Sequence, residues 1–266
     1  MQFKKNNHKH IWILTGTGDG LPLVKALLQE GFKVSVSVVT ENAALPYRDL
    51  PIEAVFTGPL KSSKTIRIFL DKANSSENRF DWVIDATHPF AKIISANLKL
   101  ACNQIKQPLL RFERFVNTSP AAYLIQEIDD IPIQYLIEKN ILFAIGSREL
   151  ASAVNNASKL GANIFARVLP YPESIRLALG SNIPSENLAI IKPMQFKKSG
   201  LIENALCQKW NINTLICRES GGITQAVWQE VCEHRKINLF MIKRPEILPD
   251  LTCVRSLDEL LQKISS

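Results

Sequence analysis

The strongest constraint on the fold is an alternation, from residue 11 onward, of short apolar runs with amphipathic stretches. Residues 11–14 form an apolar run that enters a glycine-rich loop, and apolar side chains then recur at helical spacing up to Gly31. Strands that alternate with helices favour parallel sheets joined by right-handed crossovers. We therefore expect an α/β protein whose parallel sheets are flanked by helices.

The same pattern predicts the individual elements. The helix over residues 90–105 has the most regular apolar spacing, and the last helix, over residues 257–264, has Ser256 as its expected N-cap. Residues 113–121 hold charge, Asn, Thr, Ser and Pro, so we expect one α/β domain over residues 1–115 and a second over 116–266. Strands are expected near residues 11–14, 34–39, 52–56, 82–84, 108–112, 141–145, 163–167, 188–191, 213–217 and 238–242.

Composition excludes several classes of protein. Hydrophobic residues make up 46% and charged residues 21% of the chain, which is neither the balance of a disordered chain nor that of a membrane protein. No run of about 18 apolar residues occurs. The first ten residues are polar and basic with no apolar segment behind them, so a cytoplasmic protein is expected. The five cysteines form no CxxC pair, so we expect free, mostly buried thiols and no metal site.

The net charge of +7 indicates little about partners. Lys4, Lys5 and Lys9 supply three of these charges, which leaves +4 for the rest of the chain. No dense Lys/Arg stripe with interleaved aromatic residues is present, so nucleic acid is not expected as a partner. A polyanionic small substrate remains open, as does the choice between a monomer and a small homo-oligomer.

The first candidate site is the loop Gly16-Thr17-Gly18-Asp19-Gly20, which follows the first expected strand. Ligands of open α/β sheets bind beyond the carboxyl ends of the strands, and glycines before a helix N-terminus let a phosphate approach the backbone. The match to G-x-G-x-x-G is incomplete because Leu21 occupies the third glycine position, and no P-loop lysine follows. Phosphate or dinucleotide binding and a plain tight turn both remain open.

The second candidate site is the segment Asp85-Ala86-Thr87-His88-Pro89-Phe90-Ala91, between the fourth strand and the most regular helix. Pro89 restricts His88 to extended geometry and begins the helix, which holds the histidine at the expected ligand edge. His88 is therefore a candidate proton donor or hydrogen-bond donor. The alternatives are a helix cap and a structural histidine.

The third candidate feature is a set of arginines that end or follow apolar runs. Any one of them is expected in a surface ion pair, but together they suggest a ligand rich in carboxylates or phosphates. Ser220-Gly221-Gly222 lies between an apolar run and an expected helix, as the first glycine loop does. It is therefore a second candidate ligand-binding loop, and a simple strand-to-helix turn is the alternative. The arginines are Arg111, Arg114, Arg148, Arg167 and Arg218.

Several motifs together resemble one family. The segment from Asp85 to Ala91, followed by Ile94-Ser95-Ala96-Asn97, is similar to the signature of the precorrin-6A reductases of cobalamin biosynthesis. Val38-Val39-Thr40-Glu41 and Arg167-Val168-Leu169-Pro170 are more similar to the cobalt-precorrin branch. Further motifs occur in the family's order, namely Thr15-Gly16-Thr17-Gly18-Asp19-Gly20, Leu110-Arg111-Phe112-Glu113-Arg114, Gly146-Ser147-Arg148-Glu149-Leu150, Ser220-Gly221-Gly222 and Arg244-Pro245.

The resemblance implies an oxidoreductase that uses NADH or NADPH to reduce one double bond of a polycarboxylate corrin-type macrocycle, (cobalt-)precorrin-6A, to (cobalt-)precorrin-6B. It implies two Rossmann-like domains with the ligand cleft between them. From its position after the fourth strand, His88 is the candidate catalytic residue. A non-catalytic tetrapyrrole- or dinucleotide-binding protein on the same fold is the alternative. The cofactor residues are expected to be Gly16, Thr17, Gly18, Asp19, Gly20, Thr40, Glu41, Thr87, His88 and Pro89. The macrocycle residues are expected to be Arg111, Arg114, Ser147, Arg148, Arg167, Arg218, Ser220, Gly221 and Gly222.

The sequence also bears on the choice of cofactor. Glu41 follows the second strand about 20 residues after the glycine loop, where a Rossmann unit places the acid that binds the adenosine ribose. Glu41 would repel a 2′-phosphate at this position, and we expect no arginine beside Glu41 to offset the repulsion, since the nearest is Arg48 beyond Pro46. We therefore expect NADH to be favoured over NADPH.

The chain departs from the family pattern at some positions. Thr15 replaces the first glycine, Glu219 adds a negative charge before Ser220, and Trp228 stands where members commonly carry lysine. The Gly-Pro-Phe segment of the family is Lys192-Pro193-Met194 in this chain. Most of these departures concern the expected macrocycle contacts of the second domain.

Overall fold

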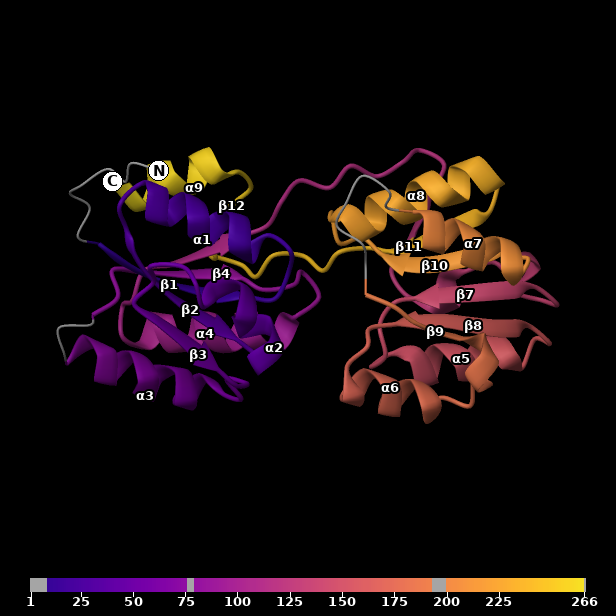
Figure 1. Cartoon of the computed structure of the whole chain (residues 1–266), viewed down its shortest axis with the longest axis horizontal. Helices are drawn as coiled ribbons and strands as arrows, with labels where there is room; N and C mark the ends of the chain where they lie inside the picture. Colours follow the sequence, from indigo (N-terminus) through magenta and orange to yellow (C-terminus); the bar gives the residue numbers. More distant parts are fainter. Residues whose placement is uncertain (1–8, 76–78, 193–199, 266) are drawn as a thin grey trace. The chain divides into compact units, whose positions relative to one another are not determined.

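The structure is a computed structural model that describes residues 9–75, 79–192 and 200–265 (Figure 1). It divides into two compact units, one formed by the described residues up to Phe115 together with those from Pro245 onward, and one formed by Val116–Arg244. Each unit contains one six-stranded sheet in which all paired strands are parallel. Pro193 and Met194 of the departing segment lie outside the described residues.

The first unit has the strand order β12-β5-β4-β1-β2-β3. In Figure 1, α1 and α9 cover one face of this sheet, and α3 and α4 cover the other. The strands are β1 (His10–Thr15), β2 (Lys33–Val38), β3 (Ala54–Thr57), β4 (Trp82–Ala86), β5 (Leu109–Phe112) and β12 (Cys253–Val254). The helices are α1 (Gly20–Gln29), α2 (Glu41–Ala44), α3 (Ser63–Asn74), α4 (Lys92–Gln104) and α9 (Leu257–Ser265), with a 3₁₀ turn η1 (Leu45–Tyr47).

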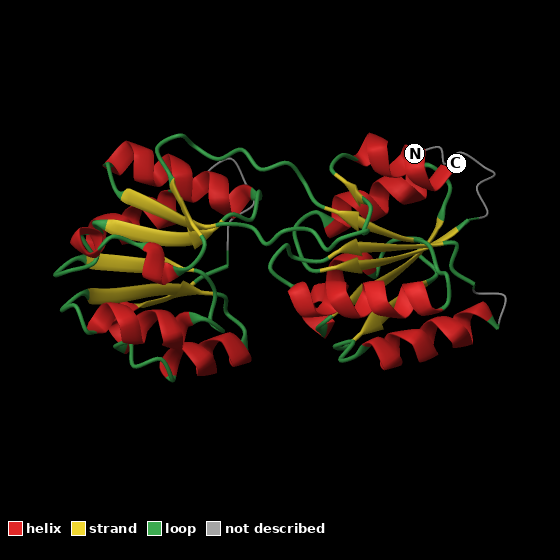
Figure 2. Cartoon of the chain, turned by 180° about the vertical axis from the view of Figure 1, so that it is seen from behind, coloured by secondary structure: helices red, strands yellow, loops and turns green. Residues whose placement is uncertain are grey.

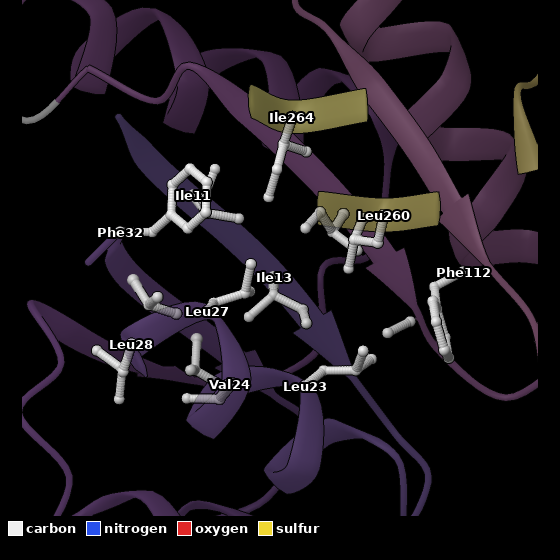
Figure 3. Packing of buried hydrophobic residues seen from close by; sticks show 14 of the residues in the cluster. Ile11, Ile13, Leu23, Val24, Leu27, Leu28, Phe32, Phe112, Leu260 and Ile264 are labelled. Atoms are coloured by element: carbon white, nitrogen blue, oxygen red, sulfur yellow. The ribbon is translucent and has the colours of Figure 1, made fainter. Parts of the chain in front are cut away.

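The apolar core of the first unit follows from the alternation of side chains along β1. Ile11 and Ile13 pack with Leu23 and Leu27 of α1 on one face, whereas Trp12 packs with α3 and α4 on the other. Figure 3 shows the first of these clusters, in which side chains of α9 join those of β1 and α1. A strand buried on both faces reads as a continuous apolar run, which is why the sequence locates β1 well.

The second unit has the strand order β6-β11-β10-β7-β8-β9. Figure 2 shows helices on both faces of each sheet. The strands are β6 (Tyr123–Ile125), β7 (Asn140–Ala144), β8 (Asn163–Val168), β9 (Leu188–Ile190), β10 (Thr214–Arg218) and β11 (Asn238–Ile242). The helices are α5 (Leu150–Ser158), α6 (Pro172–Leu179), α7 (Leu201–Lys209) and α8 (Ile223–Arg235), with 3₁₀ turns η2 (Ile128–Asp130), η3 (Ile133–Tyr135) and η4 (Ser185–Asn187).

The expected fold class is confirmed, but one domain assignment is wrong. The C-terminal segment from Pro245 belongs to the first unit and not to the second. The strand β12 pairs with β5, with Cys253 opposite Arg111, and α9 buries Leu260 and Ile264 in the core of the first unit. The apolar stripe of this helix is covered there, which explains why the chain returns to its first unit.

Smaller expectations can also be compared with the structure. The backbone N–H of Glu259 donates to Ser256 Oγ at 3.2 Å, which confirms the expected N-cap of α9. Four of the five free cysteines are buried and Cys253 is partly exposed. Within the described residues, no helix is long and apolar enough to cross a membrane.

Candidate functional site

The strand order of the first unit brings two of the expected loops together. The chain runs from β1 to β2 and β3 on one side and then returns to β4 on the other side of β1. Thr15 at the end of β1 is opposite Ala86 at the end of β4, so the loops that follow these two strands are neighbours. Open α/β sheets bind ligands at such a reversal of strand order.

The glycines of the β1–α1 loop have two different roles. Gly16 and Gly18 are exposed. A Cβ at Gly16 would lie 3.6 Å from the backbone N of His88, and a Cβ at Gly18 would meet nothing within 4 Å. Gly20 is buried, and a Cβ there would lie 2.7 Å from Thr15 Cβ and closer still to Tyr47 Oη. Gly20 is therefore required by packing, whereas Gly16 and Gly18 leave the backbone open to a ligand.

A charge pair joins this loop to the end of β5. Arg114 forms an ion pair with Asp19, and both side chains are about one-quarter exposed. Asp19 Oδ2 also accepts a hydrogen bond from Thr17 Oγ1 at 3.0 Å. A carboxylate at the N-terminus of α1 would compete with an anionic ligand, and Arg114 offsets its charge. Arg114 therefore lies on the side of the expected cofactor.

The structure corrects the expected surroundings of Glu41. Arg48 Nη2 lies 3.4 Å from Glu41 Oε2, because α2 and η1 turn the chain back on itself between the two residues. Thr57 Oγ1, at the end of β3, donates to Glu41 Oε1 at 2.6 Å. Thr40 caps α2 by accepting from Ala43 N at 3.3 Å. The expectation that no arginine lies beside Glu41 is therefore wrong.

The β4–α4 turn holds His88 in one orientation. Its Nδ1 accepts a hydrogen bond from Phe90 N at 3.3 Å, and its carbonyl oxygen accepts from Ala91 N at 2.8 Å. In a neutral imidazole whose Nδ1 accepts, Nε2 carries the proton. The N-cap residue of α4 is Ala91, so His88 does not cap this helix. His88 is half-buried, with Nε2 as its hydrogen-bond donor.

Arg111 does not lie where the sequence placed it. Its side chain is 4% exposed and pairs with Asp85 Oδ1 at 2.7 Å and Glu113 Oε1 at 3.0 Å. Arg111 Nη1 also donates to Thr87 Oγ1 at 3.0 Å and to Ser95 Oγ at 3.3 Å. A guanidinium this enclosed and this well paired does not present its donors to a ligand from solution. The assignment of Arg111 as a macrocycle contact is therefore corrected.

The three remaining candidate arginines belong to the second unit, at the carboxyl ends of neighbouring strands. Arg148 follows β7, Arg167 is near the end of β8 and Arg218 ends β10. Arg218 Nη2 forms an ion pair with Glu149 Oε2 at 2.7 Å, which joins the loops after β10 and β7. Ser147 lies in the loop after β7, directly after Gly146, whose φ of +88° is the left-handed conformation that glycine adopts readily.

Arg167 is a buried arginine with unused hydrogen-bond donors. It is 9% exposed, and its Nε and Nη2 have no hydrogen-bond partner among the residues that the structure describes. Burial lowers the pKa of the Arg167 guanidinium from its ordinary value, while the carboxylate of the buried Glu203 opposes this shift. Buried donors normally have acceptors, so unpaired guanidinium nitrogens at the expected ligand edge fit an anionic group of a ligand.

Side chains form hydrogen bonds with the backbone of the loop after β10. Gly221 has a φ of +72°, and its N–H donates to Gln225 Oε1 at 2.7 Å, so this N–H is already used. Arg244 Nη2 donates to Ser220 O at 3.1 Å, and Gly222 is the N-cap of α8.

The carboxylate of Glu219 accepts from Thr118 Oγ1 at 3.1 Å and from Arg244 N at 2.9 Å. This departure from the family pattern therefore has a structural role. Arg244 stands out in the sequence only as part of a motif, and no local sequence signal marks Gln225. Trp228 is buried in the core of the second unit. Within residues 9–75, 79–192 and 200–265, no cluster of three or more His, Cys, Asp or Glu side chains is placed to hold a metal ion.

Comparisons with known proteins agree with the resemblance seen in the sequence. A family model described as precorrin-6x reductase CbiJ/CobK matches residues 10–265. The cobalt-precorrin-6A reductase of Synechocystis is 28% identical over 250 residues, covering 90% of each chain, and that of Priestia megaterium is 24% identical over 243 residues, covering 89% of this chain and 91% of the other.

A solved structure described as CobK precorrin-6A reductase shares the fold. Its TM-score is 0.75 at 21% identity, and the match covers 97% of this chain and 96% of the other. Since the family model spans almost the whole chain, the chain belongs to the precorrin-6x reductase CbiJ/CobK family of oxidoreductases.

Proposed function

We propose that this chain reduces one double bond of (cobalt-)precorrin-6A to give (cobalt-)precorrin-6B in cobalamin biosynthesis, with a reduced nicotinamide as the hydride source. The observation that carries the proposal is the open glycine loop beside the His88 turn, at the point where the strand order of the first sheet reverses. The family match over residues 10–265 supplies the reaction class.

The residues of the first unit fit a dinucleotide. The exposed backbone of Gly16 and Gly18, at the N-terminus of α1, suits a pyrophosphate, and Arg114 adds a positive charge beside it. Thr40 and Glu41, at the start of α2, suit the adenosine ribose. When bound, the reduced nicotinamide supplies the hydride, and the chain's task is to hold its rings in place and exclude competing reactions.

The choice between NADH and NADPH depends on Glu41 and Arg48. We propose that NADH is favoured, because two like charges about 4 Å apart repel by roughly 1–4 kcal/mol. The preference is expected to be modest, since Arg48 offsets part of the charge of Glu41 in an exposed pair, and such pairs contribute about 0–1 kcal/mol. Glu41→Gln should move the ratio of kcat/KM values toward NADPH, and Arg48→Ala should move it toward NADH. A wild type that strongly prefers NADPH contradicts this assignment.

His88 is proposed as the proton donor, through Nε2. Reduction of a ring double bond adds a hydride to one carbon and a proton to its neighbour, and His88 Nε2–H would give that proton and regain one from water. The hydrogen bond from Phe90 N to Nδ1 leaves the proton on Nε2. His88→Gln should lower kcat by about 10- to 100-fold, the low end of acid–base effects. A wild-type kcat would exclude His88 from the chemistry.

The carboxylates of the macrocycle are proposed to bind Arg148, Arg167 and Arg218 of the second unit, together with Ser147 and the loop 220–222. The orphaned donors of Arg167 are the main support for this proposal. A charge-assisted hydrogen bond contributes about 1.5–3 kcal/mol, so Arg167→Met should raise the KM for the macrocycle roughly tenfold or more. The Kd of the cofactor should not change, and Arg176→Met, at an exposed ion pair on α6, is the matched control.

The alternative is a protein of the same fold that binds a tetrapyrrole or a dinucleotide without catalysis. Oxidation of the reduced nicotinamide that depends on the macrocycle distinguishes the two. A reductase oxidises the cofactor only when the macrocycle is present, whereas a binding protein changes ligand spectra without turnover.

A further inference from the structure

A buried polar cluster of the first unit includes the residue that precedes His88. It consists of Arg111 on β5, Glu113 directly after β5, Asp85 on β4, Thr87 in the β4–α4 turn and Ser95 on α4. Arg111 and Asp85 are 3% and 0% exposed. The pairing of β4 with β5 sets these two residues opposite each other, so the cluster is built into the register of the sheet.

Asp85 fixes the turn that precedes His88. Its Oδ1 accepts from the N–H of Thr87 at 3.1 Å and from Thr87 Oγ1 at 2.6 Å. An aspartate that binds the backbone two residues further on shapes a local turn, and here the next residue is His88. Three donors therefore meet at Asp85 Oδ1, two from Thr87 and one from Arg111.

Arg111, on the neighbouring strand β5, contacts the same turn. Its Nη1 contacts both Asp85 Oδ1 and Thr87 Oγ1, and it reaches Ser95 on α4, so one guanidinium connects the strand, the turn and the helix that follows. Its Nε and Nη2 both contact Glu113 Oε1 at 3.0 Å, which fixes the plane of the fork. Only the five-donor fork of arginine makes these contacts together, and lysine does not reproduce them.

We propose that Arg111 is a positioning residue for the reaction: through Asp85 and Thr87 it holds the His88 turn so that Nε2 is presented beside the glycine loop. The proposal rests on the proposed role of His88, but it assigns to Arg111 and Asp85 a function distinct from ligand binding. It also accounts for an arginine at a strand end whose side chain lies inside the protein.

The test compares Arg111→Lys with the wild type by steady-state kinetics and by ¹⁵N NMR of the histidine side chains. The chain has four histidines, and His88→Gln identifies the His88 signal by its loss. Arg111→Lys should lower kcat about 10- to 100-fold, as displacement of a reacting group by about 1 Å does. The KM for the macrocycle and the Kd of the cofactor should stay within about threefold, because no direct contact is lost. The His88 nitrogens should lose the shift difference that marks a single tautomer.

Two further variants guard against a trivial loss of stability. Ser37→Ala removes the acceptor of Trp12 Nε1 at 2.8 Å in the same sheet, away from the cluster, and should lower Tm without changing kcat or the His88 signal. Thr87→Val keeps the size of the side chain and removes the hydroxyl between Arg111 and Asp85. It should lower kcat and change the His88 signal as Arg111→Lys does, so it tests the proposal if Arg111→Lys does not fold; an unchanged kcat and His88 signal would overturn it.

The outcomes separate this proposal from the proposed function. A raised KM with unchanged kcat would mean that Arg111 binds the substrate, and an unchanged His88 signal would mean that it does not position the turn; either overturns the inference. If Arg111→Lys changes the His88 signal and keeps wild-type kcat, then Arg111 positions the turn but His88 takes no part in the chemistry. The kcat of His88→Gln tests the role of His88 independently.

Discussion

Two glycines of one loop should respond to the same substitution in opposite ways. A Cβ at Gly20 would lie 2.7 and 2.8 Å from two carbons of the buried Thr15, well inside the 3.5–4.0 Å of a normal carbon contact. It would also meet the hydroxyl of Tyr47, which donates to Thr15 Oγ1 at 3.2 Å. Overpacking of this kind costs about 1–3 kcal/mol, so Gly20→Ala should lower the free energy of unfolding by that amount.

Gly18→Ala should leave stability unchanged and reduce cofactor affinity. A Cβ there meets nothing within 4 Å, and Gly18 is not in the left-handed region, so the free energy of unfolding should stay within about 0.5 kcal/mol of the wild type. If the pyrophosphate packs against this backbone, the added methyl group overpacks the complex instead. A cost of about 1–3 kcal/mol corresponds to roughly a 5- to 150-fold rise in the Kd.

The assay pairs thermal and denaturant unfolding with a fluorescence titration of the reduced cofactor. Gly180→Ala, at the end of α6 in the second unit, is the control, because its Cβ would make contacts of 3.5 Å or longer and lies outside the site. Wild-type affinity in Gly18→Ala would refute binding of the cofactor at this loop. Wild-type stability in Gly20→Ala would refute the packing argument.

Two more predictions follow from buried titratable groups. Burial raises the pKa of the Cys102 and Cys217 thiols to about 12. Native protein at neutral pH should therefore expose at most one thiol to a thiol reagent, that of Cys253, whereas all five should react after unfolding. Rapid reaction of several thiols in the native protein would contradict this. Burial also lowers the pKa of His10 below its ordinary 6.5, so the unfolded state binds the proton more readily. The contribution of neutral His10 to the free energy of unfolding is therefore complete above pH 6.5. It is lost as the pH falls toward the lower pKa that His10 has in the folded state. Unfolding curves at about pH 7.5 and 5.5 should show a smaller difference for His10→Gln than for wild type, and an equal difference would refute the account.

Some elements of the fold could be predicted from the sequence and others could not, for physical reasons. The strand β1 is buried on both faces, so its apolar run is legible without tertiary information. The return of the C-terminal segment to the first unit was not predicted, because β12 has only two residues and its pairing with β5 is a contact over a long stretch of chain. The amphipathic pattern of α9 predicts a helix but not which core covers it.

The candidate site shows the same limit. The sequence correctly predicts that the glycine loop and the His88 turn lie at the same edge of the first sheet, because both loops follow the carboxyl ends of parallel strands. It did not reveal that Arg111 points inward, since a strand-end arginine is compatible with either direction. Asp85 and Glu113 were both visible as acids within the motifs, but their shared cation depends on the pairing of β4 with β5. Arg48 reached Glu41 only through the compact turn between them.

The most direct test of the central claim is a single anaerobic turnover experiment with purified protein, reduced nicotinamide and (cobalt-)precorrin-6A. Cofactor oxidation should occur only when protein and macrocycle are both present, and mass spectrometry should find a product that has gained two hydrogen atoms. A deuterium label on the transferred position of the cofactor should appear on a ring carbon of that product. Binding of both ligands without oxidation of the cofactor, or a product without the label, would contradict the assignment of this chain as a nicotinamide-dependent reductase.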